Sequence, residues 1–176
     1  LSSSSAASDV YKRQKKYTIY ANDISYLRNL EKVVTKGKTE GVLNLKYNFV
    51  SYNVELLRKE NILSSQNKST IVDKNFKLYE LDAFKFFITD EILKAKNLVI
   101  TSDSSIPLGQ SDIVKFDNGF FNLKENSYVA SKTEVNLRKD TFDDIENDPR
   151  LKGASSNSKT QITTVNNSVF TIWKNR

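Results

Sequence analysis

The chain has 176 residues, with 27 Lys and Arg, 21 Asp and Glu, a net charge of +6, and neither His nor Cys. These absences remove the usual general base, a thiol nucleophile and the commonest zinc ligands, so the sequence predicts a non-catalytic protein without a cofactor. Basic residues are interspersed with acidic ones instead of forming a block, so the charge is only a weak argument for a nucleic-acid partner, and none is predicted. An anionic lipid or sugar-phosphate partner fits the charge equally well.

The first fourteen residues are set aside from the fold. The run "LSSSSAASDVYKRQ" (1–14) resembles the translation of a sequencing-library adapter, and the alternative is a flexible Ser-rich tail. We expect the protein proper to begin at Lys15, already inside a strand, and the chain to be cut again at Arg176. The sequence therefore reads as a fragment.

Four similar units follow, and apolar residues alternate with polar ones at a period of two in each. The units cover residues 17–42, 47–72, 75–100 and 111–137. Val34, Leu63, Leu93 and Val129 follow the four turns, 29, 30 and 36 residues apart. A period of this size is typical of stacked supersecondary units, and alternation at two makes each unit a β-hairpin. The prediction is an all-β fold over residues 15–137, a folded antiparallel sheet of stacked hairpin repeats.

Local signals refine this picture along the chain. Residues 24–34 are the nearest rival to a strand, but their place in the repeat favours β over helix. The alternation slips by one near Val50, which predicts a corner of the sheet at residues 48–51. Residues 101–112 form an irregular loop. Residues 138–176 are predicted as an extension of the same domain, with a polar stretch to residue 161 and one or two strands in 162–173.

The inner faces of such hairpins would line a long hydrophobic slot, which is either a closed core or an open channel for an acyl chain. Alternation nominates these slot residues: Ile24, Tyr26, Val34, Val54, Leu56, Leu63, Phe84, Phe86, Leu93, Phe121 and Val129. A photo-crosslinking residue at Phe84 or Phe86 should label acyl chains. The acidic run at 143–148 could hold calcium but lacks the full loop pattern, so a solvated turn is preferred.

The units "YTIYANDISYLRN…VVTKGKTEGV" and "YELDAFKFFITDEILKAKN" resemble the OstA-type repeat of the lipopolysaccharide-transport proteins LptA, LptC and the N-terminal part of LptD. The segments "ENDPRLKGASS" (146–156) and "VNNSVFT" (165–171) look like the part of LptD that leads towards its outer-membrane barrel. The resemblance covers residues 17–172. Many relatives have a Cys shortly after the Phe/Tyr-Thr pair, where this chain has Trp173. Either this member lacks the corresponding disulfide, or the last residues of the fragment depart from the natural sequence.

The resemblance implies an OstA/LptA-like β-jellyroll at the periplasmic face of the outer membrane, which holds lipopolysaccharide acyl chains and catalyses nothing. Its implied partners are lipopolysaccharide, an LptA-like jellyroll paired edge to edge, and an LptE-like lipoprotein if a barrel follows. Two alternatives stay open. One is a free-standing LptA-like or LptC-like bridge protein, and the other is a β-solenoid glycan-binding or adhesin domain.

Overall fold

The computed structural model describes residues 17–107, 109–142, 147–160 and 162–174. Within these ranges the regular structure is thirteen β-strands and two short 3-10 helices, η1 (Arg28–Leu30) and η2 (Lys139–Phe142), which confirms the all-β prediction. The strands are β1 (Tyr17–Leu27), β2 (Lys32–Leu43), β3 (Tyr47–Tyr52), β4 (Glu55–Leu57), β5 (Ile62–Ser65), β6 (Ser69–Asp73), β7 (Leu78–Leu81), β8 (Ala83–Phe87), β9 (Ile92–Thr101), β10 (Ile113–Asn122), β11 (Ser127–Asn136), β12 (Asn147–Lys159) and β13 (Ile162–Lys174).

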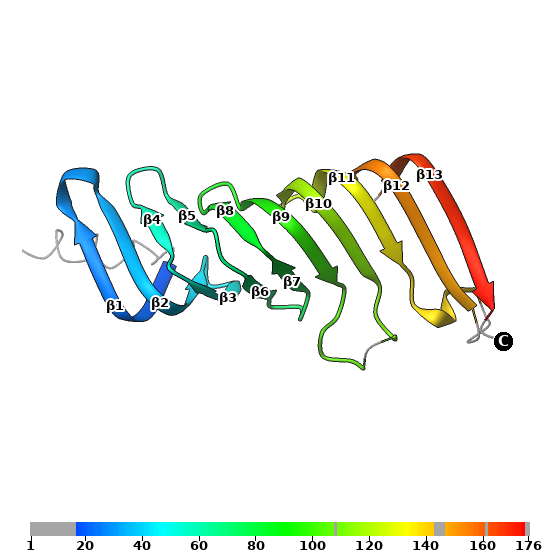
Figure 1. Cartoon of the computed structure of the whole chain (residues 1–176), viewed down its shortest axis with the longest axis horizontal. Coiled ribbons are helices and arrows are strands. Elements are labelled where there is room, and N and C mark those ends of the chain that lie inside the picture. The colour runs from blue at the N-terminus through cyan, green and yellow to red at the C-terminus, as the bar shows by residue number, and fades with distance from the viewer. Residues whose placement is uncertain (1–16, 108, 143–146, 161, 175–176) are drawn as a thin grey trace, which may run out of the picture.

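Part of the sheet closes on itself. Strands follow in the order β9-β7-β6-β3-β2-β4-β5-β8, and β8 pairs back onto β9, so β2 to β9 form a closed antiparallel barrel. Strands β10 to β13 extend the sheet from β9, and β1 extends it from β2. Figure 1 shows these strands succeeding one another along the long axis, from β1 at one end to β13 at the other.

The barrel is flattened into two layers, because β2 and β9 each serve both of them. The end of β2 pairs with β3 and its beginning with β4. Likewise the end of β9 pairs with β7 and its beginning with β8. We call β3, β6 and β7 the β3 layer, and β4, β5 and β8 the β8 layer. The long strands β10 to β13 continue both layers beyond the barrel.

A line of irregular residues marks where the strands pass from one layer to the other. Residues with left-handed φ lie here on β2, between β3 and β4, and on β9, β11 and β13, namely Gly37 (79°), Asn53 (49°), Asn97 (49°), Lys132 (47°) and Asn167 (48°). Glycine and asparagine adopt this conformation most readily, and such bulges bend a sheet. We call this line the fold line. The predicted corner at 48–51 is wrong by a few residues, since β3 runs straight through it and the bend comes at Asn53.

The opposite side of the molecule carries the hairpin turns of both layers, and we call it the mouth. On the β8 layer, four turns each place a left-handed residue just before the return strand, namely Glu31, Asn61, Glu91 and Asn126. These residues are 30, 30 and 35 apart, so the backbone repeats the period seen in the sequence.

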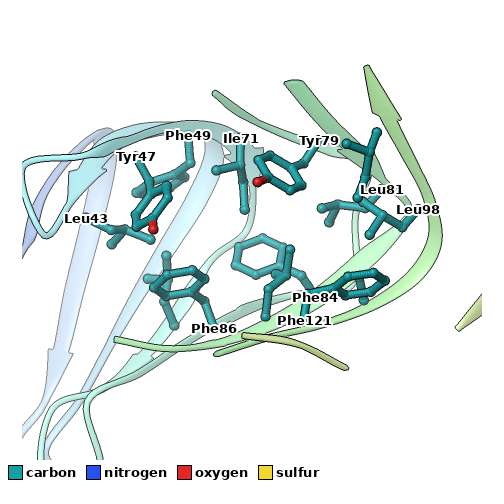
Figure 2. Close-up of a cluster of buried hydrophobic side chains, with 14 of the residues drawn as sticks. Leu43, Tyr47, Phe49, Ile71, Tyr79, Leu81, Phe84, Phe86, Leu98 and Phe121 are labelled. Carbon is teal, nitrogen blue, oxygen red and sulfur yellow. The ribbon is translucent and has the colours of Figure 1, made fainter. Parts of the chain in front are cut away.

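Apolar side chains face inward from both layers in two cross-strand rows. Residues paired directly across antiparallel strands lie on the same face. The row on the β8 layer is Tyr26, Val33, Leu56, Leu63, Phe86, Leu93, Phe121 and Tyr128. The row on the β3 layer is Ile19, Gly41, Phe49, Ile71, Tyr79, Ile100, Val114, Val135, Leu151 and Phe170. In Figure 2, Phe49, Ile71 and Tyr79 face Phe84, Phe86 and Phe121 across the interior.

Burial along these rows is highest in the middle of the molecule and falls towards both ends. Phe86 and Ile71, inside the barrel, are fully buried, and burying such a side chain contributes about 1.5–3 kcal/mol. At the ends, Tyr26 is 47% exposed and Phe170 is 49% exposed, although both lie in the inner rows. The interior is therefore a packed core in the barrel and an open apolar surface on the outermost strands.

Candidate functional site

The best-formed hollow of the interior lies at the mouth, where the barrel gives way to the open strands. It has a volume of about 270 Å³, just below the range of about 300–1,000 Å³ for small-molecule sites. Its walls come from both layers. They are formed by Lys77, Tyr79, Ile100, Ser102, Asp112, Val114, Phe116, Phe121, Asn122, Leu123, Asn126, Ser127, Tyr128 and Ser158. We call it the mouth pocket.

Three aromatic rings form the back wall of the mouth pocket. Phe116 lies 5.2 Å from Phe121 and 5.2 Å from Tyr128, measured between ring centroids, and Phe121 stacks on Tyr128 at 5.6 Å. Tilted and offset contacts of this kind are the preferred geometry of aromatic pairs. The cluster presents flat apolar surfaces to the pocket while its members fix one another in place.

Gly119 makes this aromatic arrangement possible. It pairs with Ala130 and Ala95 across the sheet, and a Cβ at this position would lie 2.6 Å from the ring of Phe121. The ring therefore lies flat on backbone that only glycine leaves free. A larger residue would displace Phe121 and with it the back wall of the pocket.

One amine stands at the rim. Lys77 lies in the pocket lining, and its ammonium nitrogen is 5.6 Å from the centre of the Tyr79 ring. Burial lowers the pKa of Lys77, and the Asp73 carboxylate opposes that shift only in part. An anionic group bound at the rim would stabilise the charged amine, so the pocket combines an apolar interior with one cationic site at its entrance.

A polar link closes the mouth on the barrel side of the pocket. The Glu91 carboxylate, on the β8 layer, accepts hydrogen bonds from Lys46 Nζ at 2.8 Å and from the Tyr47 hydroxyl at 2.9 Å, both on the β3 layer. Asn44 Nδ2 donates to the Ile88 carbonyl at 2.7 Å beside it. The backbone carbonyl of Glu91 also accepts from the amide of Leu123, which lines the pocket. We call the Glu91–Lys46–Tyr47 contact the latch.

The carboxylate of the latch, that of Glu91, is kept ionised by the hydrogen bonds that it accepts. Burial alone raises the pKa of Glu91, but the hydrogen bonds from Lys46 and Tyr47 outweigh burial and leave the pKa below its ordinary value. Tyr47 responds in the opposite sense, because burial first and the Glu91 carboxylate second raise the pKa of its hydroxyl. The carboxylate is thus charged and the phenol neutral at neutral pH, which preserves both hydrogen bonds.

The nominated slot residues fall into three groups. Seven are buried in the core, namely Val54, Leu56, Leu63, Phe84, Phe86, Leu93 and Phe121, and of these Phe121 alone lines the mouth pocket. Ile24 and Tyr26 lie on the inner face of β1, 51% and 47% exposed, because β1 lies outside the barrel.

Val34 and Val129 are corrections, because both side chains point away from the interior. Val34 pairs with Ser25 and Glu55 on the outer face, and Val129, 65% exposed, pairs with Phe120 there. The residues in equivalent inward positions are Val33 and Tyr128, each two places after the left-handed turn residue, as Leu63 and Leu93 are. The predicted inward positions of the first and fourth hairpins were therefore wrong by one residue.

Sequence reasoning missed most of the mouth pocket. Tyr79, Ile100 and Val114 are inward members of alternating runs, and that signal was present in the sequence. The sequence around Lys77 does not indicate a site. Nothing in it shows that this residue, in the connection between β6 and β7, will lie at the edge of an apolar pocket. The pocket also depends on which strands of the two layers face each other. Long-range strand pairing decides this, and the alternation of apolar residues does not reveal that pairing.

Two further predictions concern residues that the structure describes only in part. Most of the acidic run, from Asp143 to Glu146, lies outside the described residues, while Asp148 binds Arg150. The side chain of Trp173 is likewise outside what the structure describes. Over the described ranges there is no group of three or more acidic side chains arranged to hold a metal ion. In the same ranges, no helix is long and apolar enough to cross a membrane.

The fold and the site define an all-β protein with a closed antiparallel barrel, extra strands and an apolar pocket at the mouth. No protein-family model matches the chain, and no curated protein sequence matches it either.

Proposed function

We propose that this protein is a non-catalytic carrier that holds the acyl chains of lipopolysaccharide between its two layers. The observation that carries the proposal is the pair of inward apolar rows, which run the length of the sheet and open into the mouth pocket. The rows are packed inside the barrel but stay exposed on the outer strands and at the mouth pocket. Such an apolar surface can accept a chain of methylene groups, whose transfer from water is favourable by about 0.8 kcal/mol each.

The pocket chemistry supports an amphiphile over a polar solute. Its back wall is the Phe116, Phe121 and Tyr128 cluster, which offers contact area and few hydrogen bonds. Its rim holds the Lys77 amine, whose charged form an anionic neighbour would stabilise against burial. An acyl chain within and a phosphate at the rim would satisfy both features.

The particular family remains part of this proposal. A folded antiparallel sheet of hairpins with an apolar interior suits the OstA/LptA-like β-jellyroll that the sequence resembles. On that basis we assign the protein to lipopolysaccharide transport at the periplasmic face of the outer membrane, as the entrance domain of an LptD-like assembly protein. A free-standing bridge protein of the LptA or LptC kind would use the same interior.

The end strands suit edge-to-edge partners. β1 and β13 are long, and each pairs on one side only among the described residues, with β2 and β12 respectively. Unpaired backbone groups on such an edge can accept a further strand. We propose that an LptA-like jellyroll docks there, which would join the two apolar interiors, and that an LptE-like lipoprotein joins if a barrel follows.

A site-specific photo-crosslinking pair tests the carrier function. A benzophenone amino acid is placed at Tyr128, which lines the mouth pocket, or at Glu134 of the same strand, which lies on the outer face of the β3 layer. After irradiation with purified lipopolysaccharide, we expect an adduct at Tyr128 and little at Glu134. Phe84 and Phe86 are buried inside the barrel, so labelling there also requires the barrel to open.

Two results would contradict the proposal. One is a folded Tyr128 variant that gives no adduct, and the other is equal labelling at Tyr128 and Glu134, which indicates non-specific adsorption. Capture of a lipid-free polysaccharide at either position would favour the glycan-binding alternative instead. Circular dichroism of each variant confirms that the sheet has formed before the labelling is compared.

A further inference from the structure

The outer face of the β8 layer has an apolar row of its own. Leu57, Ile62, Phe87 and Ile92 are successive cross-strand neighbours, and their side chains point away from the interior and are only partly covered. Phe120 and Val129 face each other directly on the next strands and are 54% and 65% exposed. Ile92, Phe120, Val129 and Lys159 also line a shallow hollow of about 530 Å³.

Lysines accompany this row without acidic partners. Lys85 and Lys94 are paired across β8 and β9, and Lys96 lies two residues further along β9. Among the residues that the structure describes, none of the three forms an ion pair. Lys94 Nζ lies 5.1 Å from the centre of the Phe120 ring, so charge and apolar surface are adjacent.

The acidic content of the four barrel strands of this face is low, and Glu125 is the one carboxylate that lines the hollow beside Phe120. Along β4, β5, β8 and β9, the outward side chains of this layer include one carboxylate, that of Glu55, and it is neutralised by Lys32 at 2.8 Å. On the outer face of the β3 layer, two lysines have acidic partners, since Lys38 binds Glu40 and Lys152 binds Glu134 at 3.2 Å. Lys115 lies there too, opposite the same Glu134 on the neighbouring strand. The three lysines Lys85, Lys94 and Lys96 without an ion pair are therefore gathered on the outer face of the β8 layer.

We propose that the outer face of the β8 layer docks on the surface of a lipid bilayer that carries anionic headgroups. Unpaired lysines beside partly exposed apolar side chains match the two layers of a membrane interface, since phosphates attract the amines and the acyl boundary accepts the apolar groups. A second copy of this chain is a poorer occupant, because it would place one set of lysines against another. The inference does not depend on what the interior holds.

Vesicle co-sedimentation of the 176-residue chain tests the proposal. Vesicles of phosphatidylglycerol mixed with phosphatidylcholine are compared with vesicles of phosphatidylcholine alone. Binding should require phosphatidylglycerol and weaken with salt, because exposed charges are screened over a length of about 10 Å at 0.1 M. The double variant Lys85→Gln, Lys94→Gln should bind about 25-fold more weakly, at about fivefold for each lysine removed.

A matched control separates this face from net charge. Lys38→Gln, Lys152→Gln removes the same charge from the opposite layer and should change binding by less than about twofold. Phe120→Ser, Val129→Ser tests the apolar part at two exposed positions, where folding is not at risk, and should also weaken binding. Equal losses in the two lysine pairs, or no binding to anionic vesicles, would overturn the proposal. A self-association that the Lys85→Gln, Lys94→Gln variant abolishes would overturn it in favour of a second copy.

Discussion

At the scale of single residues, Glu91 is the one acidic side chain that is buried among the described residues. An isolated buried carboxylate is costly, but this one accepts hydrogen bonds from Lys46 and Tyr47 on the opposite layer. The interaction is also topologically distant, because these partners are more than forty residues away in sequence. Glu91 therefore fixes how the two layers meet at the mouth, beside the pocket.

We expect Glu91→Ala to destabilise the protein by about 1–3 kcal/mol, because it leaves the buried Tyr47 hydroxyl without its acceptor. Chemical denaturation measures the free energy of unfolding. Glu40→Ala breaks an exposed ion pair with Lys38 and should change it by less than about 0.5 kcal/mol. An equal effect of the two substitutions would show that the latch does not form in solution.

The pH dependence follows from the lowered pKa of Glu91. The stabilisation is present above the ordinary glutamate pKa of 4.5 and is lost as the pH falls through the lowered value of the folded state. The gap in stability between the wild type and Glu91→Gln should therefore be larger at about pH 7 than at about pH 3. Denaturation at both pH values measures it, and a gap that does not change with pH contradicts the assignment.

At the scale of the elements, we expect the bend of a strand that carries a fold-line residue to depend on that residue, and Gly37 is the one on β2. Gly37 has a φ of 79°, its amide donates a hydrogen bond to Asn53 Oδ1 at 2.8 Å, and its carbonyl accepts one from the Asn53 amide. A Cβ at Gly37 would meet nothing within 4 Å. Any penalty for a side chain here is therefore a matter of backbone conformation and not of space.

Gly37→Ala should destabilise the protein by about 1 kcal/mol, since the left-handed region costs an L-residue about 1–2 kcal/mol and the stiffer unfolded chain offsets part of that. Lys36→Ala, one residue away on the same strand, should stay within about 0.5 kcal/mol. Thermal or chemical unfolding compares the two. A neutral Gly37→Ala would mean that β2 does not bend at this residue.

The elements also show how far the sequence could predict this fold. Alternation at two and the repeat sufficed for the all-β class and for the four turns. They did not show which side chains of the return strands point inward, because Val33–Val34 and Tyr128–Val129 are both apolar pairs and alternation fits either member. The position of the left-handed turn residue decides this, since the inward residue comes two places after it. Strand β12 was missed because its run of Ser, Asn and Lys has no apolar alternation.

At the scale of the whole molecule, the middle of the sheet is a closed barrel and its two ends are open. The barrel between β2 and β9 buries its inner rows, whereas β1 and β13 leave theirs exposed. The mouth pocket lies where the closed barrel passes into the open strands. Its position therefore depends on the pairing of β8 with β9, which closes the barrel. The sequence could not predict the pocket, because alternation does not reveal that pairing. The proposed carrier function would use both parts, because the packed barrel holds the layers together while the open strands leave apolar surface for a ligand or partner.

This division predicts unequal effects for two equal substitutions in the inner rows. Phe86→Ala removes a fully buried ring from the barrel and should cost about 3–5 kcal/mol. Phe170→Ala removes a ring that is 49% exposed and contacts Phe142 at 6.0 Å, so it should cost less than about 1.5 kcal/mol. Chemical denaturation of both variants at several protein concentrations checks the difference. If Phe170→Ala is as costly as Phe86→Ala and the cost grows with concentration, then the open end is covered in solution by another copy, and the apolar interior is not free to receive a chain at that end.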